Sequence, residues 1–197
     1  MANIGAVILA AGESSRLGRP KQLIEFRGKT LVRRVVDAAD EAGCSPITVV
    51  IGSDGKKVAH ELEQTSAAIV ENETWRNGIG TSIRAGMQSL VERRPGLDAV
   101  VVLVSDQPLV EAELIKQIIA RHGEMGKTII ASGYSRTLGV PALFDRSHFE
   151  ELLTLPDDSG AKSIILSRRA RVVEFPFPQG NVDIDTLADY EKLVAQS

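Results

Sequence analysis

Hydrophobic and polar positions alternate along this chain in blocks that predict strands and helices in turn. Uninterrupted apolar runs at 6–11 and 99–104, and a β-branched run at 46–51, are typical of buried parallel strands. Between the strands at 6–11 and 46–51, the segment 30–42 carries apolar residues at helical spacing and ends before a glycine. Because strands and helices alternate, the chain is expected to be α/β, with three layers: a mostly parallel central sheet and helices on both faces.

Weaker patterns predict the remaining elements. Strands are expected at 67–70 and 128–131, and helices near 56–64, 82–91, 111–122 and 148–155, with one more helix opening at Gly160. The segment 182–185 alternates as a strand would, and Thr186 is the predicted N-cap of a last helix.

The first strand runs directly into a loop rich in glycine, serine and cations. Five residues separate Gly12 from Gly18, and Lys21 follows three positions later, so the spacing is not that of a Walker A loop. In open α/β sheets ligands bind beyond the carboxyl ends of strands, where backbone N–H groups suit anions. Arg16 and Lys21 can neutralise a polyphosphate. We interpret the loop as one that binds a nucleoside triphosphate.

Composition narrows the function classes. The chain has 197 residues, 43% hydrophobic and 25% charged, which is typical of one soluble globular domain over 1–197. A net charge of -3 argues against binding to nucleic acid or to an anionic membrane surface. Cys44 is the single cysteine and forms no internal disulfide. Without an apolar run of membrane-spanning length or a signal-peptide pattern at the N-terminus, a cytoplasmic location is expected.

Two further loops carry candidate chemistry. The strand at 99–104 is the most hydrophobic and is expected to be central, so Asp106 would lie at its carboxyl end, facing the glycine loop. A carboxylate there suits Mg²⁺, which takes one or two protein carboxylates plus phosphate oxygens and water. Gly78 and Ser82 precede a helix and could approach a base or an anion. Trp75 is interpreted as a packing residue, and His148 as a surface or boundary residue.

The order Leu9-Ala10-Ala11-Gly12-x-Ser14-x-Arg16-x-Gly18-x-x-Lys21 resembles the signature of the MobA-like nucleotidyltransferases. Within that family it is most similar to the MocA-type branch, the molybdenum cofactor cytidylyltransferases. The later elements at Trp75, at Asp106-Gln107-Pro108 and at 183–189 extend the similarity along most of the chain. The resemblance implies a Rossmann-like nucleotidyltransferase fold.

The resemblance also implies roles for individual residues. Catalytic roles fall to Arg16, Lys21 and Asp106, and Mg²⁺ binding to Asp106 and Asp185, with Asp185 preferred over Asp183. The implied nucleotide-binding residues are Leu9, Ala10, Ala11, Gly12, Arg16, Lys21, Gly78 and Ser82. The implied acceptor-binding residues are Gly139, Pro141, Gly160 and Lys162.

The implied reaction transfers a nucleoside monophosphate from an NTP, with CTP favoured, to the phosphate of molybdopterin or the molybdenum cofactor, and releases pyrophosphate. A client molybdoenzyme would receive the product. Ala11 supports CTP because the guanylyltransferases carry glycine there, whereas Leu9 departs from the threonine often found in the cytidylyltransferases. Val140 departs from the family's histidine. The alternatives are a guanylyltransferase, another phosphorylated acceptor, or a non-catalytic maturation factor that binds molybdenum cofactor.

Overall fold

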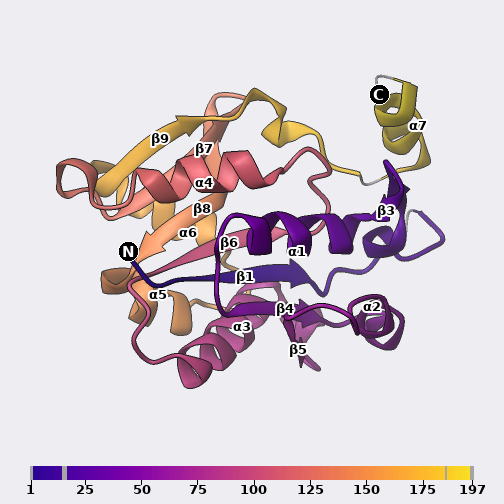
Figure 1. Cartoon of the computed structure of the whole chain (residues 1–197), viewed down its shortest axis with the longest axis horizontal. Helices are drawn as coiled ribbons and strands as arrows, with labels where there is room; N and C mark the ends of the chain where they lie inside the picture. Colours follow the sequence, from indigo (N-terminus) through magenta and orange to yellow (C-terminus); the bar gives the residue numbers. More distant parts are fainter. Residues whose placement is uncertain (1, 15–16, 185, 196–197) are drawn as a thin grey trace.

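A computed structural model describes residues 2–14, 17–184 and 186–195. Within these residues, seven strands form one sheet (Figure 1), in the spatial order β5 (Ala68–Glu71), β4 (Ile47–Ile51), β1 (Ile4–Ala10), β6 (Ala99–Val104), β8 (Thr137–Asp145), β7 (Ile129–Tyr134) and β9 (Val172–Pro176). β8 runs antiparallel to both of its neighbours, and the other neighbouring pairs are parallel. The expectation of a mostly parallel central sheet is confirmed.

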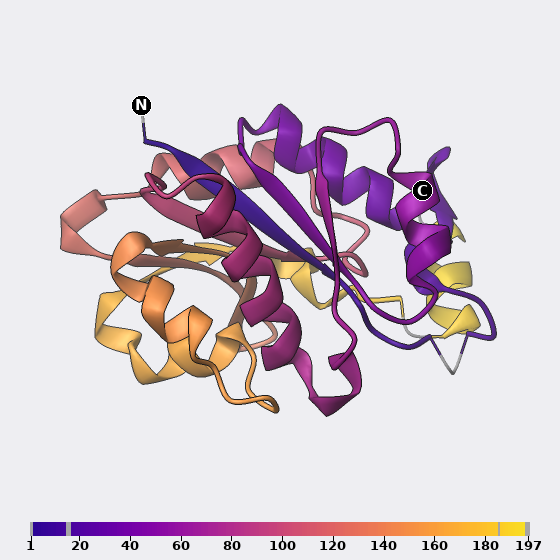
Figure 2. The same cartoon turned by 90° about the horizontal axis from the view of Figure 1, so that it is seen from below.

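Helices cover both faces of the sheet, and Figure 2 shows the sheet between them. One layer contains α1 (Leu31–Glu41), α2 (Gly55–Glu61) and α4 (Ala112–Ala120), and the other contains α3 (Ile79–Arg93), α5 (Phe149–Leu153) and α6 (Ala161–Ser167). Successive side chains of β1 point to opposite faces of the sheet, so Ile8 packs in the core of the first layer and Val7 in that of the second. A Cβ at Gly86 would come within 2.5 Å of Val7 Cγ1, so glycine lets α3 lie close to the sheet.

A small third core lies near the carboxyl end of β1. It joins the β2–β3 hairpin (Glu25–Phe26 and Lys29–Thr30) to α7 (Leu187–Ala195). Its buried residues are Ile24, Phe26, Leu31, Ile184 and Leu193. Thr186 caps α7 as predicted, since its Oγ1 accepts a hydrogen bond from Asp189 N (3.2 Å) and Asp189 Oδ2 accepts one from Thr186 N (2.9 Å).

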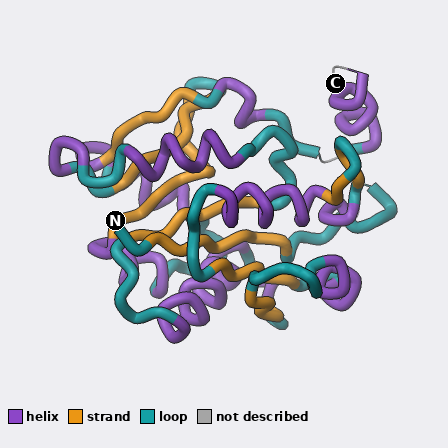
Figure 3. Tube along the Cα trace, viewed as in Figure 1, coloured by secondary structure: helices purple, strands orange, loops and turns teal. Residues whose placement is uncertain are grey.

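The structure corrects the predicted strand at 182–185 over its described part, 182–184. These residues are not in a strand, and Figure 3 shows loop before α7. Ile184 N donates to Asp106 O (3.2 Å), so the segment is held by the loop after β6 and not by a sheet partner. A hydrogen bond to a loop far along the chain cannot be predicted from the local sequence pattern.

α3 begins at Ile79, one turn before the predicted start near Ser82. Gly78 is its N-cap residue, with φ 139°, and Gly80 N donates to Asp157 O (2.9 Å). A contact with a segment far along the chain therefore starts this helix. The sequence pattern also missed β9, which completes the sheet beside β7 through a parallel pairing.

His148 is buried, which corrects its expected place as a surface or boundary residue. Its Nδ1 donates to Glu151 Oε1 (2.8 Å), and its Nε2 is 2.8 Å from Thr128 Oγ1. Burial tends to raise the pKa of Glu151, but hydrogen bonds from His148 and Arg168 outweigh it and hold the pKa below its ordinary value of 4.5.

The Glu151→Gln variant should lose more stability at pH 7 than at pH 3. A lowered pKa in the folded state contributes stability above the ordinary value of 4.5, and that contribution disappears as the pH falls through the folded-state pKa. The loss should be under about 1 kcal/mol, because the pair is partly exposed. Urea unfolding at both pH values measures it, with exposed Glu150→Gln as the matched control. An equal loss at both pH values would contradict the assignment.

None of the helices in the described residues is long and apolar enough to cross a membrane.

Candidate active site

The carboxyl ends of β1 and β6 lie side by side, because Leu9 pairs with Val104 in a parallel register. The glycine loop and Asp106 therefore leave the sheet at the same edge, as the sequence predicted. A cavity of about 210 Å³ opens there. It is lined by Leu9, Ala11, Gly12, Lys21, Gln22, Trp75, Ile79, Ser82, Val104, Ser105 and Asp106.

Most of the predicted nucleotide residues meet at this cavity. Leu9, Ala11, Gly12, Lys21 and Ser82 line it, together with Asp106. Ala10 is buried in β1 with 1% exposure and is not part of the lining. Arg16 and Asp185 lie outside the described residues, so their predicted roles stay predictions.

Lys21 and Asp106 form an ion pair across the cavity. Lys21 Nζ is 2.5 Å from Asp106 Oδ2, and the two side chains are 16% and 23% exposed. Lys21 N also donates to Ser14 Oγ (2.8 Å), which ties the lysine to the glycine loop. The bond between Lys21 Nζ and Asp106 joins two charged groups, and such hydrogen bonds are stronger than those between neutral groups. The carboxylate of Asp106 thus already holds a cation at the place where a metal was predicted.

The donor set fits a divalent cation that also binds phosphate. Within the described ranges no group of three His, Cys, Asp or Glu side chains could hold a metal by itself. Mg²⁺ needs only one or two protein carboxylates when phosphate oxygens and water complete its octahedron. Asp106 supplies one such carboxylate.

Gln22 organises the glycine loop, and the sequence analysis did not single it out. Its side chain is 1% exposed, and Nε2 donates to Ala10 O (3.0 Å) and Gly12 O (2.9 Å). Ala11 O accepts a hydrogen bond from Ser53 N (3.4 Å). Three successive carbonyl groups are therefore bonded within the protein, which suits a loop that receives an anion. The sequence shows only a glutamine after Lys21, and nothing local marks it as buried.

Asn72 holds the helix N-terminus that faces the loop. It is buried, and its Nδ2 donates to Thr81 Oγ1 (2.8 Å) and Ser82 Oγ (2.9 Å). Its Oδ1 accepts hydrogen bonds from the N and Oγ1 of Thr74 (3.0 and 2.9 Å). Ser82, a predicted nucleotide residue, is thus fixed in the first turn of α3.

Trp75 both packs and lines the cavity. A Cβ at Gly52 would lie 2.8 Å from its indole ring, so the ring rests on a glycine. On another side, the Arg76 guanidinium is 4.4 Å from the ring centroid. The packing predicted for Trp75 is present, and the same ring forms part of the cavity wall.

A contact that we call the α3 latch joins the segment Leu155–Asp158 to the start of α3. Arg84 donates to Leu155 O and to Asp157 Oδ1, the latter at 2.5 Å. A Cβ at Gly78 would lie 2.1 Å from Asp157 O, so Gly78 is required by this close backbone approach. Its predicted contact with the nucleotide stays a prediction.

A second cavity of about 150 Å³ adjoins the first and shares Leu9, Ile79 and Val104 with it. Its other lining residues are Ile83, Val102, Tyr134, Gly139, Val140, Gly160, Ala161 and Lys162. The structure thus brings together three of the four predicted acceptor residues. The fourth, Pro141, is buried within β8, and its carbonyl accepts a hydrogen bond from Ser132 Oγ (2.7 Å).

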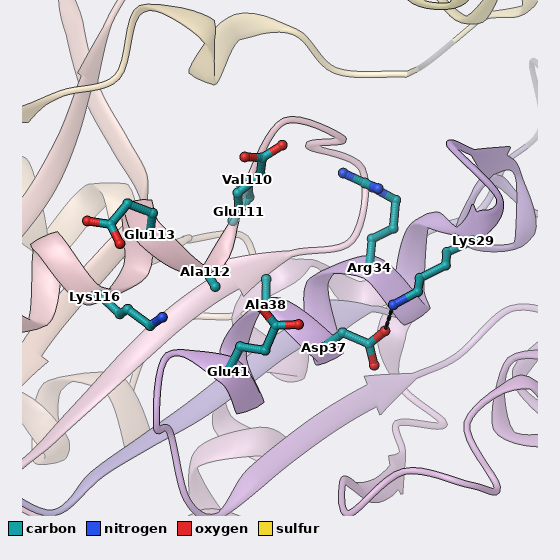
Figure 4. A pocket seen from close by; sticks show the side chains of 10 residues that line it. All are labelled: Lys29, Arg34, Asp37, Ala38, Glu41, Val110, Glu111, Ala112, Glu113 and Lys116. Carbon is teal, nitrogen blue, oxygen red and sulfur yellow. Dashed lines mark hydrogen bonds and ion pairs between the residues drawn. The ribbon is translucent and has the colours of Figure 1, made fainter. Parts of the chain in front are cut away.

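A larger groove of about 390 Å³ lies between α1 and α4 (Figure 4). Three cations and four carboxylates line it: Lys29, Arg34, Lys116, Asp37, Glu41, Glu111 and Glu113. Lys29 Nζ and Asp37 Oδ2 are 2.6 Å apart. These side chains give the groove a net charge of -1, and it contains no predicted site residue, so size alone does not locate the active site.

The fold and the cavity at the strand ends define a Rossmann-like α/β protein with a ligand site at the carboxyl edge of its parallel strands. The family model of the MobA-like NTP transferase domain matches residues 6–172. The chain belongs to this family.

Solved structures and curated proteins include clear relatives. Rv0371c from Mycobacterium tuberculosis H37Rv is 30% identical, with a TM-score of 0.82 and 98% of both chains covered. A second structure of that protein, in complex with manganese, is 28% identical over 100% of both chains, with a TM-score of 0.79. Nicotine blue oxidoreductase from Paenarthrobacter nicotinovorans is 30% identical over 146 residues, 74% of this chain and 68% of its own length.

Other relatives are much longer. Bifunctional protein GlmU from Bifidobacterium animalis subsp. lactis is 32% identical over 124 residues, which is 61% of this chain and 27% of that protein. The chain therefore matches about a quarter of the length of this relative.

Proposed function

We propose that this protein is a metal-dependent nucleotidyltransferase that transfers a nucleoside monophosphate from an NTP, with CTP favoured, to the phosphate of a molybdopterin-type acceptor. One observation carries the proposal: Lys21 and Asp106 form an ion pair in a cavity lined by the glycine loop, and this cavity adjoins a second one lined by three of the four predicted acceptor residues. Cation-binding and phosphate-binding groups thus lie where two phosphorylated substrates would meet.

In this reaction an acceptor phosphate oxygen bonds to the α-phosphorus of the NTP, and the bond from that phosphorus to the bridging oxygen of the β-phosphate breaks. The electron pair leaves with pyrophosphate. No protein base is needed, because a phosphate monoester is largely ionised near neutral pH. Asp106 would hold the divalent cation, which when bound neutralises phosphate charge. Lys21 would leave its ion pair with Asp106 and bind the β- and γ-phosphates, which the backbone at Gly12 would also approach.

One feature supports CTP. Ala11 lines the cavity and narrows it by one methyl group relative to glycine, a difference that discriminates modestly between substrates. The manganese complex of Rv0371c supports a divalent cation.

Pyrophosphate release with each of the four NTPs, with and without molybdopterin, tests the proposal. We expect release with CTP that depends on both a divalent cation and molybdopterin. Pyrophosphate release with GTP in preference to CTP would change the assigned nucleotide and leave the proposed reaction unchanged. Tight molybdopterin binding without release from any NTP would show a binding protein instead. A relative named an oxidoreductase makes this control necessary.

A further inference from the structure

Tyr134 lines the second cavity, and no sequence motif marks it. It is the last residue of β7 and pairs with Thr137 across a tight hairpin. Ser135 and Arg136 make that turn with φ 48° and 60°. The hairpin carries Tyr134 to the wall of the second cavity, which Gly139 and Lys162 also line.

Two glycines make room for the Tyr134 side chain. A Cβ at Gly139 would lie 2.2 Å from the phenol oxygen, and a Cβ at Gly180 would lie 2.4 Å from Cδ1. Real Cβ atoms essentially never approach other atoms so closely. A side chain at position 139 or 180 would therefore collide with the Tyr134 hydroxyl or ring. This gives Gly139, a predicted acceptor residue, a physical role: it lets the Tyr134 hydroxyl reach the cavity.

The surroundings of the phenol keep it a hydrogen-bond donor. Burial raises the pKa of Tyr134, the carboxylates of Asp183 and Asp106 raise it further, and the Gln107 side chain offsets only part of this. Gln107 is itself fixed, since its Nε2 donates to Gly180 O (2.7 Å). Because its pKa lies above the ordinary value of 10.0, the phenol is neutral at neutral pH and can donate a hydrogen bond into the cavity that it lines.

The rest of the cavity offers few polar partners. Ile83, Val102 and Val140 line it with apolar atoms, and Lys162 adds one charge. A polyhydroxylated molecule would leave hydroxyl groups without hydrogen bonds there, which costs binding free energy. A flat ring with a phosphate group matches the lining better.

The geometry points to Tyr134 as the residue that selects the acceptor: its ring forms one wall for a flat acceptor body, and its hydroxyl donates a hydrogen bond to the acceptor in the second cavity. This inference rests on the proposed function for the identity of the second cavity as the acceptor site. It goes beyond that function in naming the residue that discriminates between ring-bearing and polyhydroxylated phosphate monoesters.

Calorimetry with phenyl phosphate and glucose 1-phosphate as probes tests the inference. Phenyl phosphate should bind the wild type more tightly than glucose 1-phosphate. Tyr134→Phe should weaken phenyl phosphate binding about fivefold, the effect of one lost hydrogen bond. Tyr190→Phe, which removes the hydroxyl of the other tyrosine, should leave it unchanged. Equal phenyl phosphate affinity in wild type and Tyr134→Phe, or equal affinity for the two probes, would overturn the inference.

A second variant and a second signal separate the possible failures. Gly139→Ala keeps the phenol but displaces its hydroxyl, so it should also weaken phenyl phosphate binding, and it decides the question if Tyr134→Phe does not fold. CTP binding, followed by fluorescence of the single tryptophan Trp75, should be the same in Tyr134→Phe and wild type. An equal loss of CTP affinity would overturn the acceptor role. Tyr134-dependent phenyl phosphate binding without any NTP binding would refute the proposed function and uphold the site.

Discussion

Asp106→Asn should lower kcat by between about 10² and 10³-fold while CTP still binds. The substitution keeps the shape of the side chain but removes the charge that would hold the divalent cation, and losing one preorganised electrostatic contact to a transition state has this size of effect. The substitution also removes the ion pair between Lys21 and the side chain at position 106. Steady-state pyrophosphate release and Mn²⁺ binding by calorimetry measure the two effects separately.

Asp40→Asn is the matched control, since it makes the same chemical change on the exposed side of α1. It should leave both turnover and Mn²⁺ affinity unchanged. Unchanged turnover and unchanged Mn²⁺ affinity in Asp106→Asn would refute the metal assignment, while the assignment of the nucleotide cavity would stand.

Gly80→Ala should destabilise the fold by about 3 kcal/mol and lower Tm by roughly 6 to 12 °C. A Cβ at this position would lie 2.0 Å from Pro156 O, a backbone atom that cannot turn aside, so the α3 latch must open. The sign is informative, because alanine for glycine inside a helix otherwise stabilises by up to about 1 kcal/mol. Thermal unfolding provides the measurement.

Gly96→Ala serves as the comparison, because no heavy atom lies within 4 Å of a Cβ at that position. Its effect should stay within about 0.5 kcal/mol. If Gly80→Ala proved as stable as the wild type, the close contact between α3 and the segment Leu155–Asp158 would not exist in solution.

Local sequence predicted the first half of the site well. A strand without alternation followed at once by glycine is legible without tertiary information, and so is an aspartate after the most hydrophobic strand. Their meeting followed from a general rule, since ligands bind at the carboxyl ends of parallel strands. The structure confirms this in the ion pair of Lys21 with Asp106.

The parts that failed depend on partners far along the chain. The pattern predicts a helix from near Ser82, whereas α3 begins at Ile79, where Gly80 N bonds to Asp157 O and Gly78 lies close to the same carbonyl. The alternation at 182–185 resembled a strand, yet the described residues there bond to the loop after β6. Glycine at a close contact and glycine in a loose turn have the same local pattern.

Sequence by itself determined the layers, the mostly parallel sheet and the edge where the glycine loop and Asp106 lie, because hydrophobic periodicity and strand-end chemistry are local properties. Only the tertiary structure decided what surrounds that edge. It buried Gln22 under the loop, latched Arg84 to Asp157, and set Tyr134 against Gly139 and Gly180. Those contacts join residues separated along the chain, and their energies exist only once the chain has packed.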